Sequence, residues 1–320
     1  MKNELWYDIF MGFLHKKYPR KNQLTAALMD LLSIEREAVY RRLRGDVKFH
    51  AEEVVKIAST WHFSIDELIS LNEGMIPFQG IMTNYLNPSE EDMEILHNRL
   101  KALEHLKYAQ DSEYMVVSNN VSRSLACGFE YIYRFNIFKW AYLYSKDANN
   151  ISFAEAVLPE EVCTEFRKFN KIMKFVQNTS YIFEQNIFEN FVRDIQFFHS
   201  ILLITDKEKK LIKKDLLALI DYLLDVATTG VFPETKNKVQ IYISMININT
   251  NYSYFYTDKL KTCRVHAFNM HDICTYHPQT LEQFRNWMQL KKRVSILISE
   301  TDAKSRVEFF SKQRQFAESL

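Results

Sequence analysis

The sequence predicts a mainly α-helical protein, with an N-terminal five-helix domain and a larger helix-rich α+β domain that contains a small antiparallel sheet. The chain of 320 residues is longer than one small domain usually is. It has only six Gly and six Pro against 24 Phe and 17 Tyr, which favours helices around an aromatic core. Apolar residues recur at three- and four-residue spacing along most of the chain, and β-branched runs gather near its end.

Five short helices are expected in the N-terminal domain. Apolar stripes predict the first four at about 4–15, 23–32, 35–44 and 50–60. Pro19 follows the first of these helices, and Gly45 stands at a C-cap position after the third. Ser64 with Glu67 three residues later forms a capping box, which predicts the start of a fifth helix.

A composition change marks the expected boundary between the domains. Segment 73–88 holds two of the six glycines and two of the six prolines, as linkers commonly do. The expected organisation is a domain at 1–74, a linker at 75–88 and a second domain at 89–320. Within that second domain, helices are expected at about 90–110, 160–178, 180–204, 207–228, 279–291 and 301–319, and antiparallel strands at 239–248, 252–257 and 263–268.

Three patterns in the second domain allow two interpretations each. The aromatic stretch 129–144 fits a buried core or the lining of a pocket for a flat ligand. The apolar spacing at 93–103 fits intradomain packing or a short coiled coil between two copies. The Cys/His run 263–277 has metal-like spacing, but residues three apart in a strand point to opposite faces, so no metal is expected there.

The composition also bounds the class of protein. The motifs of nucleotide-binding loops, serine hydrolases and zinc proteases are absent from the sequence, so neither an enzyme nor a cofactor is expected. No apolar run reaches the roughly 18 residues of a membrane span, and the N-terminus does not resemble a signal peptide. The four cysteines are widely spread rather than grouped as in a disulfide framework, so reduced thiols are expected. A cytoplasmic protein is therefore expected.

Positive charge is concentrated inside the N-terminal domain. The whole chain has a net charge of only +1, but residues 16–48 contain nine basic and four acidic residues, a net charge of +5. A local basic surface of this kind is what contact with phosphates requires.

Residues 24–69 carry a family resemblance. The matching positions are an apolar pair at Leu28–Met29, a turn at Ser33–Glu35, a helix exit at Arg41 and Gly45, and two closing helices at Ile57–Ala58 and Ser64–Leu68. In this pattern the segment resembles the phage-repressor-type helix-turn-helix, also called the xenobiotic-response-element family. The resemblance implies a double-stranded DNA reader whose recognition helix is 35–44. Ser33 stands where the family has Gly, and Met29 where it has a small Ala.

The recognition helix is expected to turn Ala38, Val39 and Leu43 toward the domain core and to present its other face to DNA. Base edges are read mainly by the first turns of this helix, which makes Arg36 and Tyr40 the candidates for base contacts. Glu37 can accept a hydrogen bond from cytosine.

Four further residues are expected to bind the DNA backbone. Arg41, Arg44 and Lys48 are placed for phosphates, which position the module without specifying sequence. The resemblance adds Thr25, which occupies the usual phosphate-contacting position of the family.

A weaker resemblance covers the second domain. The residues that carry it are Asn119–Val121, Phe138–Trp140, Ile241–Ser244, Ser295–Ser299 and Glu308–Phe310. They resemble the C-terminal halves of repressor-type regulators from Bacteroidetes. This implies a sensor or dimerisation domain with an unknown small-molecule or peptide effector. The expected protein is thus a homodimeric, repressor-like transcriptional regulator. The alternative is an adaptor or antitoxin-like protein whose helix-turn-helix does not read DNA.

Overall fold

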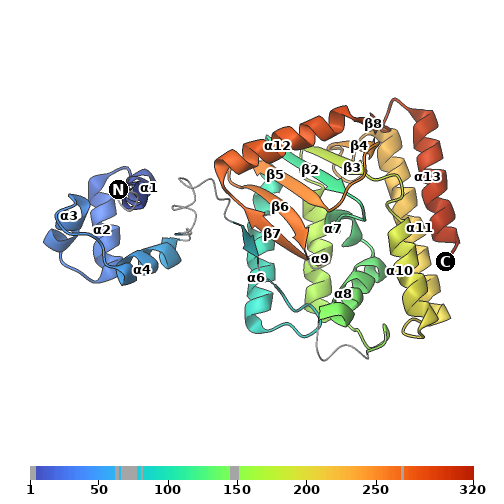
Figure 1. Ribbon diagram of the computed structural model, residues 1–320, viewed down its shortest axis with the longest axis horizontal. Helices are drawn as coiled ribbons and strands as arrows, with labels where there is room; N and C mark the ends of the chain where they lie inside the picture. The colour runs from blue at the N-terminus through green and yellow to red at the C-terminus, as the bar shows by residue number, and fades with distance from the viewer. Residues whose placement is uncertain (1–4, 62–64, 66–77, 81, 145–150, 268–269) are drawn as a thin grey trace. The chain divides into compact units, whose positions relative to one another are not determined.

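The computed structural model describes residues 5–61, 65, 78–80, 82–144, 151–267 and 270–320. The chain forms two compact units, Met1–Pro77 and Phe78–Leu320 (Figure 1). No helix in the described ranges is long and apolar enough to cross a bilayer.

The first unit consists of helices around a small core. Its helices are α1 (Leu5–Lys17), α2 (Lys21–Leu32), α3 (Arg36–Leu43) and α4 (Ala51–Trp61). Each helix contributes at least one fully buried apolar side chain: Phe10, Leu14, Leu24, Leu28, Val39 and Ile57. These four helices confirm the predicted ones within a few residues. Apart from Ile65, the fifth predicted helix lies outside the described residues.

The turn between α2 and α3 passes through a backbone conformation that glycine adopts most easily. Ser33 caps the C-terminus of α2 in the left-handed region, with φ 55° and ψ 44°. A side chain with a Cβ is strained in this region, which glycine enters freely. Ser33 therefore adopts a glycine-like turn conformation at an energetic cost. Met29 is half-buried and packs against the core of the unit.

Replacing Ser33 by glycine is expected to stabilise the first unit by about 0.5–1 kcal/mol, because the strain of a left-handed Cβ exceeds the extra chain entropy of glycine. Hydrogen exchange of amides in α2 and α3 should slow by a few-fold. Ser59→Gly is the matched control, since Ser59 lies in α4, where glycine destabilises a helix. Faster exchange in Ser33→Gly would contradict the strain.

The second unit is built on one eight-stranded sheet. Its strands are β1 (Gln79–Gly80), β2 (Ser112–Ser118), β3 (Asn178–Phe183), β4 (Lys238–Ser244), β5 (Tyr252–Thr257), β6 (Lys261–Ala267), β7 (His271–Thr275) and β8 (Ser295–Leu297). Their order is β1-β7-β6-β5-β2-β3-β4-β8. The three strands β2, β3 and β4 are parallel, and the remaining neighbours are antiparallel.

Helices cover both faces of this sheet (Figure 1). They are α6 (Glu90–Lys101), η1 (Glu104–Tyr108), α7 (Arg123–Ala126), α8 (Glu130–Tyr144), α9 (Glu160–Met173), α10 (Glu189–Ser200), α11 (Asp206–Thr229), α12 (Pro278–Arg293) and α13 (Ala303–Glu318). Alternate residues of a strand point to opposite faces. Accordingly, Val116 packs in the core formed with α8, α10, α11 and α13, while Met115 packs with Met288 of α12.

The predicted fold class is confirmed, but the sheet is larger and is mixed rather than purely antiparallel. The prediction missed β2. It was also wrong about a helix beginning at residue 180, because β3 occupies 178–183 and α10 starts only at Glu189. The helix expected at 90–110 ends at Lys101, and that expected at 160–178 ends at Met173.

The linker expected at 75–88 is also corrected from residue 78 onward. Gln79 of β1 pairs with Cys274 of β7 at the edge of the sheet. Tyr85 is 1% exposed and stacks on His271, with 5.8 Å between ring centroids. These contacts make the segment part of the second unit. Ser89 then starts α6 with a capping box that Asp92 completes.

Candidate nucleic-acid interface

Helix α3 presents one charged face to solvent. Val39 is fully buried and Leu43 is half-buried against the core, as predicted. The remaining positions follow the one-turn spacing that aligns side chains along a helix. Those on the outer face are Arg36, Glu37, Tyr40, Arg41 and Arg44; Tyr40 is half-buried and the others are exposed. The structure therefore brings five of the seven predicted contact residues onto one surface.

Arg36 and Tyr40 form a pair on this surface. The Arg36 Nε and Nη2 groups donate to the Tyr40 hydroxyl oxygen at 3.2 and 3.0 Å. The ring of Tyr40 also lies 5.4 Å from the Lys21 ammonium, measured to the ring centroid. The Arg36 guanidinium carries five N–H donors, so donors remain for a base edge or a phosphate. Sequence reasoning missed Lys21, because only the packing of α2 against α3 brings it to Tyr40.

Arg44 is held by two carboxylates. It pairs with Asp46 at 2.9 Å and with Glu37 at 3.2 Å. The hydrogen bond that Arg44 donates to the Asp46 carboxylate raises the pKa of Arg44 above its usual value. Because Glu37 is engaged in this pair, it is less available to cytosine than the sequence suggested. Arg41 is exposed, and the Lys48 ammonium lies 5.6 Å from the Tyr7 ring centroid.

Arg42 has a structural role that the sequence did not reveal. Its guanidinium makes two hydrogen bonds with the Glu53 carboxylate, at 2.9 and 2.7 Å, and so joins α3 to α4. The side chains are only 12% and 15% exposed. Burial alone raises the pKa of Glu53. Hydrogen bonds from Arg42 and from the His50 amide lower it by more, so the net pKa lies below the usual value. The ion pair fixes the orientation of the outer face of α3.

Thr25 does not fit the predicted phosphate contact. Its side chain is 2% exposed, and its hydroxyl donates to the Lys21 carbonyl oxygen at 2.8 Å within α2. Burial and this hydrogen bond together withhold the hydroxyl from DNA. The family position is occupied by the right residue type, but the side chain packs inward.

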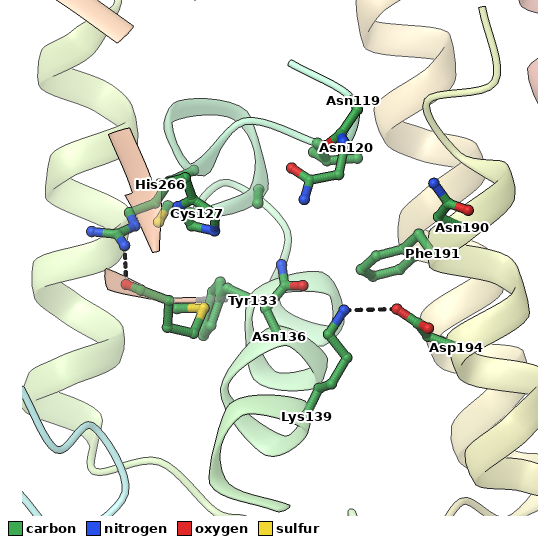
Figure 2. A pocket seen from close by; sticks show the side chains of 14 residues that line it. Asn119, Asn120, Cys127, Tyr133, Asn136, Lys139, Asn190, Phe191, Asp194 and His266 are labelled. Carbon is green, nitrogen blue, oxygen red and sulfur yellow. Dashed lines mark hydrogen bonds and ion pairs between the residues drawn. The ribbon is translucent and has the colours of Figure 1, made fainter. Parts of the chain in front are cut away.

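The second unit contains a polar cavity of about 240 Å³. It opens beyond the C-terminal end of β2, where open α/β sheets commonly bind ligands. Figure 2 shows the amides of Asn120, Asn136 and Asn190 directed toward a shared space. Lys139 and Asp194 close one side of the cavity with an ion pair of 2.7 Å.

Two further patterns of the second domain divide between packing and the cavity. In the aromatic stretch 129–144, Phe135 and Phe138 are fully buried in the core, and Tyr133 reaches the cavity. In the Cys/His run, Cys263 packs on the α12 side of the sheet. His266 lies on the other side, where its ring is hydrogen-bonded to the Asp272 carboxylate. Among the described residues, no three metal-binding side chains gather.

Comparison with known proteins bears on the first unit and on the start of the second. The family described as the BetR domain matches residues 12–118, about a third of the chain. No curated protein and no solved structure matches the chain. The part of the chain that holds α2, the turn and α3 is therefore similar to a family of helix-turn-helix-like DNA-binding domains of the regulator type.

Proposed function

We propose that this protein is a sequence-specific, repressor-like transcriptional regulator, and that it acts by binding rather than by catalysis. The observation that carries the proposal is the outer face of α3, where Arg36, Tyr40 and Arg41 follow a turn of helix-turn-helix geometry. An α-helix of this kind fits the major groove of DNA, and its first turns read base edges. The resemblance to phage-repressor-type modules supports the same function.

The proposal includes a dimer and a sensing role for the second unit. Regulators with this module bind two half-sites as two-fold symmetric dimers, with centres roughly 34 Å apart. The second unit is large enough for dimer contacts, and its polar cavity offers a place for an effector. By this proposal the protein works in the cytoplasm, on an operator of two-fold symmetry. The resemblance to regulators from Bacteroidetes supports this organisation.

Two steps test the proposal. Bound DNA duplexes are first selected from a random pool, and the selected and scrambled duplexes are then titrated with the protein at several salt concentrations. We expect an inverted repeat, and an affinity for it at least about 1,000-fold above that for scrambled DNA. The logarithm of affinity should fall linearly with that of salt concentration, because phosphate contacts release counterions. Equal affinity for both duplexes, or a flat salt dependence, would favour the alternative of an adaptor whose helix-turn-helix does not read DNA.

A further inference from the structure

Three arginines lie near one aspartate on the face of the sheet opposite α12. Asp272 stands opposite His266 in the pairing of β6 with β7, and Arg264 stands opposite Cys274. Arg264 and Asp272 are thus diagonal neighbours on one face, a separation that long side chains bridge. Arg123 of α7 reaches the same place, with its Nη1 3.5 Å from the Asp272 carboxylate. Arg99 of α6 lines the same cavity as Arg264 and Asp272.

The charges in this cluster do not balance. The Asp272 carboxylate is shared by Arg123 at 3.5 Å and His266 at 3.1 Å. Within the described part of the chain, neither an ion pair nor a hydrogen bond engages the guanidinium of Arg99 or Arg264. Burial lowers the pKa of Arg99, and the charges of Arg123 and Arg264 lower it further, while Tyr85 and Asp272 act in the opposite direction without restoring the usual value.

Several other arginines of the second unit have acidic partners. Arg285 pairs with Glu113 at 2.9 Å, and Arg314 pairs with Asp221. Partly buried cations without a counter-charge are costly. The guanidinium groups of Arg99 and Arg264, which line one cavity, are therefore suited to pair with an anion.

A cavity lies where that anion would be held. It measures about 260 Å³ and lies between α6 and the edge formed by β1, β7 and β6. Neutral hydrogen-bonding groups of Gln79, Asn98 and Tyr276 line it together with the two arginines. Guanidinium groups bind carboxylates and phosphates through paired N–H donors, whereas they have no acceptor for a cation.

We propose that this cavity binds a small oxyanion, a phosphate ester or a carboxylate, through Arg99 and Arg264. A smaller cavity is lined by Arg264, Asp272, Arg123 and His266, and the amide-lined cavity is also lined by Arg123 and His266. The body of a ligand anchored at Arg264 can thus extend toward the amides shown in Figure 2. An effect of the anion on DNA affinity rests on the proposed function, but the binding site itself does not.

Calorimetric titration of the full chain with inorganic phosphate and with malonate tests this site, with sodium chloride at equal ionic strength as the reference. We expect saturable binding of at least one anion and none of chloride. Phosphate alone identifies a phosphate-type site, and malonate alone a carboxylate-type site. Binding of neither anion overturns the proposal. Because DNA is absent, failure here and failure of the proposed function are distinguishable.

Two variants assign the binding to the arginines. Arg264→Gln and Arg99→Gln should each weaken anion affinity at least tenfold, while Arg285→Gln, which removes an arginine already paired with Glu113, should leave it unchanged. Without anion, Arg264→Gln should melt at the same temperature as the unchanged protein or higher, because it relieves repulsion between like charges. Equal loss of affinity in Arg285→Gln, or a lower melting temperature of the anion-free Arg264→Gln protein, would overturn the assignment.

Discussion

Replacing Arg42 by alanine is expected to weaken the contact between α3 and α4 in the helix-turn-helix unit. The substitution leaves the Glu53 carboxylate, 15% exposed, without its two guanidinium hydrogen bonds. Removing one partner of a buried ion pair costs about 3 kcal/mol or more, because the remaining charge stays desolvated. Amides of α3 and α4 should then exchange with solvent at least about 100-fold faster.

Hydrogen exchange measured by mass spectrometry on the full chain checks this expectation peptide by peptide. Arg41→Ala is the matched control, since Arg41 is the neighbouring arginine and is exposed. Its exchange rates should stay close to those of the unchanged protein. Similar exchange in the two variants would show that the Arg42–Glu53 pair does not hold α3 against α4.

Alanine at Arg36 or Tyr40 is expected to relax DNA specificity, with a loss of about 1–3 kcal/mol at the base pair that each side chain reads. The two residues should behave as one unit, because Arg36 donates two hydrogen bonds to the Tyr40 hydroxyl. The double variant should therefore lose less than the sum of the single losses. Competition binding with the selected operator and its single-base variants measures each loss.

Arg44→Ala is the contrasting variant for that measurement. Its charge is shared with Asp46 and Glu37, and a phosphate contact carries no base information. Affinity for all duplexes should fall alike, and the salt dependence should become shallower. Equal, sequence-independent losses for Arg36, Tyr40 and Arg44 would contradict the division of roles on α3.

The sequence predicted the elements whose side chains follow a clear period. In α2 and α4, apolar residues recur every three or four positions, and the structure places those residues inward. Strands β2 and β3 gave no comparable signal. They lie in the centre of the sheet and are buried on both faces, so their apolar runs do not alternate and resemble segments of buried helix.

The candidate site was predictable only where it depends on one helix. The outer face of α3 follows from the spacing of Val39 and Leu43. The Arg42–Glu53 pair joins residues 11 positions apart on two helices, and the Thr25 hydroxyl turns inward onto its own helix. These are consequences of tertiary packing. The anion cavity forms where β1 and α6, within residues 79–101, meet β6 and β7, within residues 261–275, and these two stretches are far apart in sequence.

The position of β2 bears on how the protein can be divided for laboratory work. The stretch of family similarity, residues 12–118, ends with this strand. In the intact chain β2 is paired along both edges, with β3 and β5, which come from residues 178–183 and 252–257. A fragment cut to the similar stretch would carry an apolar strand with two open edges and would lack the buried Phe10, so it should aggregate. A cut after Pro77 instead keeps each hydrophobic core whole.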